Sequence, residues 1–162
     1  MSDGQISLRR AGVEDAAAIA RLLHDFNTEY SEPTPGVAAL TEHGRQLLAA
    51  GEMTVLLADG SADISTGPDG ISLIRFRNSV WTGGPEAHLQ ELYVVPARRG
   101  RGIGRALLEA TIALAREAGA AGVDLNTGTT DTAARALYES AGFTNREGSP
   151  DGPSMLFYEL EF

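Results

Sequence analysis

The sequence predicts a single α/β domain, of the α+β kind, in which helices cover both faces of a mixed sheet. Its 162 residues are 43% hydrophobic and contain no cysteine, which suits one compact domain that buries a core without disulfides. The apolar spacing gives the order strand, two helices, three strands, helix, strand, helix and two strands. No internal repeat or linker interrupts this order, so residues 1–162 are expected to form one domain.

The first part of the chain predicts a strand followed by two helices. Apolar and polar residues alternate over residues 5–9, as in a strand. Over residues 13–26, apolar side chains recur every three or four positions, as on one face of a helix. Two prolines end that helix within residues 31–36, and a second helix is expected over residues 37–50.

Three strands are expected in the middle of the chain. Residues 53–58 and 71–77 read as an antiparallel pair, joined by a long Gly/Asp/Ser-rich loop over residues 59–70 that we expect to be mobile. The next strand covers residues 88–95 and ends because Pro96 cannot donate to a sheet.

The last part of the chain predicts two helices and three strands. A long helix over residues 102–118 is followed by a short strand at residues 123–126. Asp131 can cap a helix that extends to Ser140. Residues 143–147 and 155–162 are expected to form the last strands.

The charge of the chain narrows its possible partners. All 13 basic residues are arginines, and 22 acidic residues leave a net charge of −9. Such a surface repels phosphate backbones, so nucleic acid and anionic membranes are not expected as partners, whereas cationic small molecules or basic peptide ends are. The polar N-terminus and the lack of any apolar run of about 20 residues predict a cytoplasmic protein.

The segment LYVVPARRGRGIGRAL, residues 92–107, is the most informative part of the sequence. Three glycines at alternate positions open a helix, and four arginines lie within eight positions of an otherwise acidic chain. Glycines let backbone amides approach a ligand closely, and the first amides of a helix have no partner within it. Together with the helix dipole, they favour an anion such as a pyrophosphate.

Two well-known phosphate loops do not fit this segment. A dinucleotide-binding turn needs GxGxxG after a first strand, but Leu107 stands at the third glycine position when counted from Gly102. A triphosphate loop needs a lysine, which the chain lacks. The structural alternative is that the glycines only shape a tight turn and the arginines form a solvated face.

Two motifs in this order resemble the signatures of the GNAT superfamily of N-acetyltransferases. The pyrophosphate signature Arg/Gln-x-x-Gly-x-Gly/Ala matches residues 99–104, and the preceding ELYVVP fits as well. The segment DTAARALYESAGF, residues 131–143, resembles the second signature, an Asn-x-x-Ala-x-x-x-Tyr helix that ends in Gly-Phe. Here Asp131 replaces the commoner asparagine. The resemblance covers residues 89–143, and the first eighty residues agree only in the order of their elements.

The resemblance implies a mostly antiparallel sheet of six to seven strands, splayed between the fourth and fifth strands, where acetyl-CoA binds. A backbone amide near Val94 would stabilise the developing oxyanion. The amides of residues 100–105 would hold the pyrophosphate, with help from Arg98 or Arg99. By the same resemblance, the expected cofactor-binding residues are Leu92, Tyr93, Val94, Arg99, Gly100, Arg101, Gly102, Ile103, Gly104, Arg105, Asn126, Asp131, Ala134 and Tyr138.

Two residues are expected to move protons. The resemblance implies that Tyr138 protonates the departing thiolate, although the helix pattern alone would also explain it as a core aromatic. Glu91 is the candidate base, because alternation would put it on the same sheet face as Leu89 and Tyr93, beside the splay. The alternative interpretation is that Glu91 is simply an exposed glutamate on a solvated face of the sheet. No group of residues has metal-ligand spacing, so no metal is expected.

The acceptor pocket implied by the resemblance comes from the first helical pair and the hairpin before the fourth strand. Carboxylates interleaved with aromatic residues there favour a cation, although they also fit a solvated helix end. The expected substrate-binding residues are Phe26, Glu29, Tyr30, Glu32 and Trp81.

The sequence therefore predicts an acetyl-CoA-dependent N-acetyltransferase that acetylates a small cationic amine by direct attack in a ternary complex. The absence of cysteine excludes an acyl-cysteine intermediate. The alternatives are acetylation of protein N-termini or lysines, and a CoA-binding regulatory module without catalysis. A homodimer is also expected, formed through pairing of a C-terminal strand.

Overall fold

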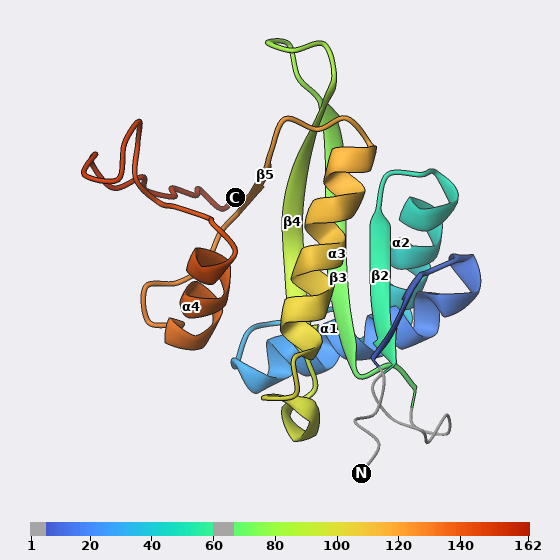
Figure 1. Cartoon of the computed structure of the whole chain (residues 1–162). Coiled ribbons are helices and arrows are strands. Elements are labelled where there is room, and N and C mark those ends of the chain that lie inside the picture. Colours follow the sequence, from blue (N-terminus) through green and yellow to red (C-terminus); the bar gives the residue numbers. More distant parts are fainter. Residues whose placement is uncertain (1–5, 60–66) are drawn as a thin grey trace. The chain divides into compact units, whose positions relative to one another are not determined.

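The computed structural model describes residues 6–59 and 67–162 of the chain (Figure 1). The chain divides after Leu125 into two compact units. The first unit contains the sheet and three long helices, and the second contains helix α4 (Thr132–Ser140). The expected loop at residues 59–70 lies largely outside the described residues.

The sheet of the first unit has five strands in the order β1-β2-β3-β4-β5. Neighbouring strands from β1 to β4 are antiparallel, and β5 alone runs parallel to its neighbour, β4. The mixed, mostly antiparallel sheet is thus confirmed. The strands are β1 (Ser7–Arg10), β2 (Thr54–Asp59), β3 (Gly70–Asn78), β4 (Pro85–Val94) and β5 (Val123–Leu125).

The expected six to seven strands are wrong for the described part of the chain, because neither C-terminal segment forms one. Residues 143–147 contribute a single bridge, from Arg146 to Ser154, and residues 155–162 contribute none. Alternating apolar residues form a strand only where a neighbouring strand accepts their backbone groups. In the described residues this tail has no such ladder, and its apolar side chains, from Met155 to Phe162, are at least half exposed.

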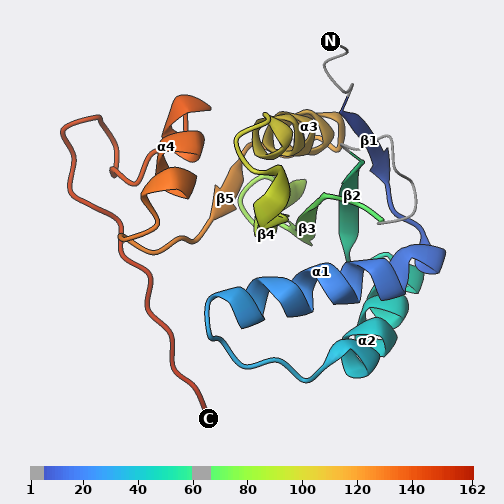
Figure 2. The ribbon, with the colours of Figure 1, turned by 90° about the horizontal axis from the view of Figure 1, so that it is seen from below.

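Helices cover both faces of the sheet, as Figure 2 shows. Helices α1 (Ala16–Glu29) and α2 (Val37–Ala49) lie on one face, and α3 (Ile103–Glu117) lies on the other. Apolar side chains of α1 pack on β2, β3 and β4 to form the main core: Ile19, Leu22, Met53, Val55, Leu57, Ile71, Leu73 and Tyr93. The structure describes no helix that is both long and apolar enough to cross a bilayer.

The first helix differs from the expected range at both ends. Residues Val13–Asp15 form a 3₁₀ turn, because Asp15 accepts from the Gly12 amide at 2.9 Å and from both outer nitrogens of Arg9 at 2.8 Å. The α-helix then continues three residues past Phe26, to Glu29. This extension places Glu29 at the end of β4, as described below.

A buried hydroxyl pair joins α3 to the sheet. Ser72 Oγ lies 2.6 Å from Thr111 Oγ1, and Thr111 also donates to the Leu107 carbonyl at 2.8 Å. Both side chains are fully buried. Because the Thr111 hydroxyl donates its hydrogen to the Leu107 carbonyl, Ser72 donates to Thr111, and both buried hydroxyls are hydrogen bonded.

Replacing Thr111 by valine is expected to lower the free energy of unfolding by about 1–3 kcal/mol, because the Ser72 hydroxyl would lose its partner. Thr41→Val is the matched control, since Thr41 makes the same bond to the Val37 carbonyl, at 2.7 Å, near the surface. Chemical denaturation measures both. Adding Ser72→Ala to Thr111→Val should recover part of the loss, and equal losses for Thr41→Val and Thr111→Val would contradict this role.

Candidate active site

The β4 and β5 strands pair over only three residues. Their partners are Ala87 with Val123, His88 with Asp124, and Leu89 with Leu125. Strand β5 then ends, whereas β4 continues to Val94. Within the described part of the first unit, the last residues of β4 therefore expose one edge without a strand partner.

A β-bulge at Gln90 decides which way Glu91 points. The register of β3 and β4 pairs Leu73 with Glu91 but Ile74 with Leu89, so Gln90 is the extra residue. Adjacent residues of β3 face opposite sides, and directly paired residues share a side. Glu91 and Leu89 consequently lie on opposite faces.

The expectation that Glu91 shares a face with both Leu89 and Tyr93 is therefore wrong for Leu89. The bulge reverses the alternation between Leu89 and Glu91, because it inserts one residue into the strand. The expectation is right for Tyr93, because Tyr93 pairs with Ile71, which lies on the same side of the sheet as Leu73. Glu91 thus faces helix α1.

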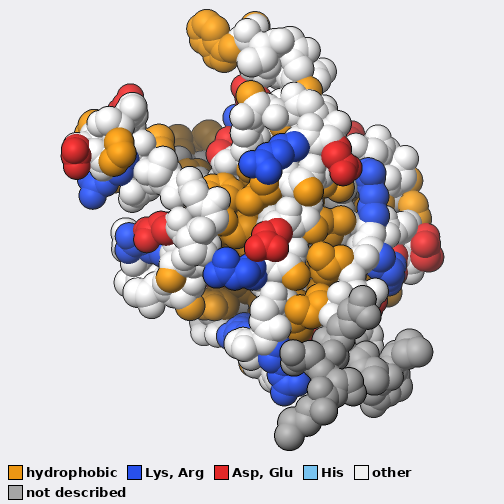
Figure 3. All heavy atoms as spheres, viewed as in Figure 1, with side chains coloured by type: hydrophobic (Ala, Val, Ile, Leu, Met, Phe, Trp, Pro, Cys, Tyr) orange, Lys and Arg blue, Asp and Glu red, His pale blue; other side chains and the backbone are white. Residues whose placement is uncertain are grey.

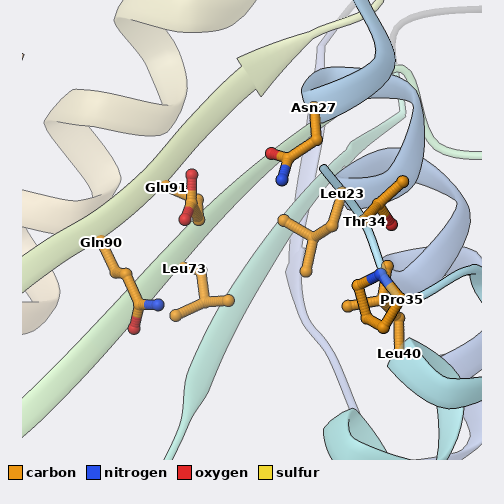
Figure 4. A pocket seen from close by; sticks show the side chains of 8 residues that line it. All are labelled: Leu23, Asn27, Thr34, Pro35, Leu40, Leu73, Gln90 and Glu91. Carbon is orange, nitrogen blue, oxygen red and sulfur yellow. The ribbon is translucent and has the colours of Figure 1, made fainter. Parts of the chain in front are cut away.

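Glu91 lines a cavity of about 160 Å³ on this face (Figure 4). Gln90, beside it, lines the same cavity, as expected when a bulge turns two consecutive side chains to one side. The walls combine apolar and neutral polar side chains from β3, α1, the α1–α2 connection and α2: Leu23, Asn27, Thr34, Pro35, Leu40 and Leu73. Glu91 supplies the only carboxylate among these lining residues.

The environment of Glu91 favours its protonated form. The carboxyl is half-buried and forms no hydrogen bond with another described residue. Burial raises the pKa of Glu91, and the nearby His88 partly opposes that shift. The His88 ring is itself hydrogen bonded through Nδ1 to Asp124. A carboxylate with a raised pKa, at the edge of a cavity, is suited to accept a proton.

The open edge of β4 also presents a backbone amide. The Val95 amide donates to the Asp69 carbonyl at 2.9 Å, on the β3 side of the strand. Backbone groups of successive strand residues point to alternate edges, so the Val94 amide points to the other edge, where β5 has ended. The Val94 carbonyl accepts from Arg99 Nε at 3.0 Å, which agrees with that direction.

The glycine-arginine turn forms the N-terminus of α3. Gly100 and Gly102 have positive φ values of 74° and 83°, which glycine adopts without strain. Gly102 is the N-cap and has no side chain to cap the helix, and the Ala106 amide donates to the Gly102 carbonyl at 2.9 Å. The amides that precede Ala106 in the helix are thus oriented for an anion, next to the exposed Arg101.

The two arginines at the start of this turn point elsewhere. Arg98 Nε lies 3.6 Å from Asp69 Oδ2, and Arg99 binds Glu29 through two hydrogen bonds. Their charges are thus compensated by carboxylates of the protein.

Gly100→Ala is expected to weaken CoA binding about tenfold, because a Cβ would both strain the positive φ and intrude on the anion site. Gly148→Ala is the matched control, because Gly148 has the same φ of 74° and the same open space around a Cβ. Isothermal titration with CoA measures the two dissociation constants. Equal CoA affinities in the two variants would show that the turn at Gly100 does not bind CoA.

The expected acceptor residues are only partly brought together. Phe26 stacks on Tyr93 with ring centroids 5.0 Å apart, and Tyr30 meets Phe26 edge-on at 5.4 Å. Glu29 lies in the same cluster, and Glu32 is exposed in the connection that follows α1. Trp81, by contrast, is 90% exposed at the tip of the β3–β4 hairpin, where Figure 3 shows hydrophobic side chains that project into solvent.

Trp81 does not join the cluster of Phe26, Tyr30 and Tyr93, because the length of β4 separates the hairpin tip from Tyr93. The hairpin tip precedes Pro85, whereas Tyr93 lies at the far end of this ten-residue strand. An extended strand of that length spans about 30 Å.

The second unit contains the remaining expected residues. Asp131 caps α4 as predicted, because its Oδ1 accepts from the Ala134 amide at 3.2 Å. Tyr138 is half-buried in that helix, with its ring centroid 5.9 Å from that of Phe143. Asn126 is exposed directly after β5.

Sequence reasoning missed most of the cavity. Asn27 lines it and also holds the α1–α2 connection, by donating from Nδ2 to the Pro33 carbonyl at 2.9 Å. Its place on α1, one turn after Leu23, was the available signal. No such signal was available for Gln90, because nothing in the strand pattern marks the bulge. Among the described residues, no cluster of His, Asp or Glu could hold a metal ion.

Comparisons with known proteins agree on one class of enzyme. The model of the acetyltransferase (GNAT) family matches residues 19–143. An aminoglycoside N(6')-acetyltransferase type 1 of Stenotrophomonas maltophilia is 33% identical over 144 residues, which cover 87% of this chain and 88% of that protein. A crystal structure from Arthrobacter sp. FB24, described provisionally as an acetyltransferase, is 44% identical with a TM-score of 0.84 and covers 96% of both chains.

A third relative is similar over a shorter stretch. Mycothiol acetyltransferase of Beutenbergia cavernae is 41% identical over 69 residues. The match covers 41% of this chain but spans only 23% of that protein's length.

Proposed function

Because this chain belongs to the acetyltransferase (GNAT) family, and is thus an N-acetyltransferase that uses acetyl-CoA, we propose that its acceptor is a small cationic primary amine. We propose further that the amine enters the Glu91 cavity and attacks the thioester directly, in a ternary complex. The observation that carries this proposal is the half-buried Glu91 carboxylate, which lines a cavity two residues after Leu89, the last β4 residue that pairs with β5.

Glu91 suits the first proton transfer. An alkylamine titrates near 10, like lysine, so it arrives as an ammonium and must lose a proton before it attacks. Once ionised, the Glu91 carboxylate attracts the ammonium, and its raised pKa makes it a better proton acceptor than an exposed carboxylate. The ammonium first loses one proton to Glu91, directly or through water, and the neutral amine then bonds to the acetyl carbon. The nitrogen loses its second proton to solvent as the tetrahedral intermediate collapses.

The Val94 amide and Tyr138 suit the rest of the reaction. An N–H at the open edge of β4 can donate to the thioester oxygen as negative charge develops on it. The carbon–sulfur bond breaks next, and the thiolate leaves more easily if it is protonated. We assign this proton to the Tyr138 hydroxyl, because Tyr138 matches the tyrosine of the family motif.

The backbone of β4 and the turn before α3 suit acetyl-CoA. Leu92 and Val94 offer backbone groups to the pantetheine arm along the unpaired edge, and the amides from Gly100 to Arg105 suit the pyrophosphate. We propose Asn126, Asp131 and Ala134 as further acetyl-CoA-binding residues, because Asp131 and Ala134 stand at positions of the second family motif and Asn126 directly follows β5. We propose that residues 1–162 act as one N-acetyltransferase domain, because the family match runs through residues of both units.

The charge of the cavity favours an acceptor that places one ammonium group inside it. Glu91 is its only lining carboxylate, while Asn27, Thr34 and Gln90 provide neutral hydrogen-bonding groups. Of the expected acceptor carboxylates, Glu29 is already compensated by Arg99. The aminoglycoside named for the 33% identical relative carries several amines and neutral hydroxyl groups, so one of its ammonium groups would pair with Glu91 while hydroxyls meet the neutral side chains.

An acceptor panel tests this function. Acetyl-CoA is offered with small amines, aminoglycosides, peptides with free N-termini and lysine peptides, and products are identified by mass spectrometry. Acetylation of a small cationic amine is the expected result. Acetylation of peptides alone would reassign the chain to protein acetylation, and CoA binding without any product would favour a regulatory module. A homodimer and a cytoplasmic location stay predictions.

A further inference from the structure

Arg99 and Glu29 bind each other, although the sequence assigned one to the pyrophosphate and the other to the acceptor. The two outer nitrogens of Arg99 donate to the two oxygens of Glu29, at 2.6 and 2.7 Å. This bidentate pair joins the end of α1 to the turn that opens α3, across 70 positions of sequence. Bidentate charge-assisted pairs are the most directional contacts that arginine makes.

Further contacts anchor this pair to the end of β4. Arg99 Nε donates to the Val94 carbonyl at 3.0 Å, and the guanidinium lies over the Tyr93 ring, 5.6 Å from its centroid. Burial, and then the negative charge of Glu29, raise the pKa of the Tyr93 hydroxyl beside this pair. The end of α1, the last residues of β4 and the glycine turn are thus held by one guanidinium.

The charge of Arg99 is compensated by Glu29, so Arg99 is not expected to bind a diphosphate strongly. The hydrogen bond from Arg99 lowers the pKa of Glu29, which keeps the carboxylate ionised at neutral pH. A guanidinium that turned to a phosphate would leave this carboxylate without the partner that lowers its pKa. Arg101, in the same turn, is exposed and better placed for that task.

The position of α1 bears directly on the cavity. Asn27 lies two residues before Glu29, lines the cavity, and holds the α1–α2 connection through the Pro33 carbonyl. Val94, the other residue tied to Arg99, carries the amide at the open edge of β4. A shift at Glu29 would therefore change both the acceptor wall and its distance from that amide.

We propose that Arg99 and Glu29 are a positioning pair, which fixes the acceptor wall relative to the end of β4 and sets acceptor affinity rather than acetyl-CoA affinity. This inference rests on the proposed acceptor cavity. It adds two positioning residues to the reaction and removes Arg99 from the phosphate ligands and Glu29 from the acceptor contacts.

The test compares Arg99→Gln, Glu29→Gln and the double variant with Arg101→Gln, using whichever acceptor the panel identifies. Each single loss at the pair is expected to lower kcat/KM for the acceptor about tenfold, mainly through KM, and the double variant should be no worse than either. The CoA dissociation constant should change less than about twofold at the pair, whereas Arg101→Gln should raise it several-fold.

Thermal unfolding of each variant separates positioning from loss of fold. A variant that melts like the wild type but has a raised acceptor KM supports the pair. Weaker CoA binding in Arg99→Gln with an unchanged acceptor KM would make Arg99 a phosphate ligand and overturn the proposal. Additive losses in the double variant would overturn it as well. CoA titration needs no acceptor, so failure of the proposed function would be recognised separately.

Discussion

Glu91→Gln is expected to lower kcat at neutral pH about a hundredfold, because general-base catalysis typically contributes that much or more. The amide keeps the size of the side chain but cannot accept the ammonium proton. Glu86→Gln is the matched control on the same strand, since Glu86 is ion-paired to Arg77 at 2.8 Å and lies outside the cavity. Steady-state kinetics with an excess of acetyl-CoA measure both variants.

The pH dependence of activity in the wild type and in Glu91→Gln tests the same role of Glu91. Wild-type activity should rise with pH as Glu91 ionises, and this rise should occur above the ordinary glutamate range because burial raises the pKa. The glutamine variant should lose that limb of the profile. An unchanged kcat and profile in Glu91→Gln would show that another group, such as solvent, takes the proton.

Glu91 also affects stability, with a sign that follows from its raised pKa. The folded state holds this proton more tightly than the unfolded chain, so the free energy of unfolding falls as pH rises through the window between the two pKa values. Above that window, Glu91→Gln should therefore unfold at a higher temperature than wild type. Below the unfolded pKa, the two proteins should differ little.

Tyr138→Phe is expected to lower kcat at least about tenfold with little change in either KM, because the thiolate would leave without a proton. The phenyl ring retains the packing of Tyr138 against Phe143, so the fold of α4 should persist. Tyr158→Phe is the matched control, because Tyr158 is 83% exposed in the C-terminal tail. Full activity in Tyr138→Phe would show that the Tyr138 hydroxyl takes no part in catalysis and that the ring only packs.

Local patterns explain why much of the fold was predictable. Strand β4 ends where Pro96 blocks further pairing, and α3 begins at a glycine with positive φ, so neighbouring residues determine both boundaries. Asp131 caps α4 for the same reason, through a bond to an amide three residues away. Signals of this kind need no knowledge of distant contacts.

The arrangement of the candidate site depends on contacts that a sequence pattern does not carry. The bulge at Gln90 moves Glu91 to the α1 face, although alternation alone would keep it with Leu89. The Arg99–Glu29 pair joins residues whose types suggested two different ligands. The apolar alternation of the C-terminal tail likewise predicts a strand but cannot supply its neighbour.

Initial rates of thiol release, measured while acetyl-CoA and a small cationic amine are varied together, test direct transfer most plainly. A ternary complex predicts that reciprocal plots for different acceptor concentrations intersect, because both substrates must be bound before the acetyl group moves. Parallel lines would instead indicate an acetylated enzyme. That result would contradict direct attack by an amine deprotonated at Glu91.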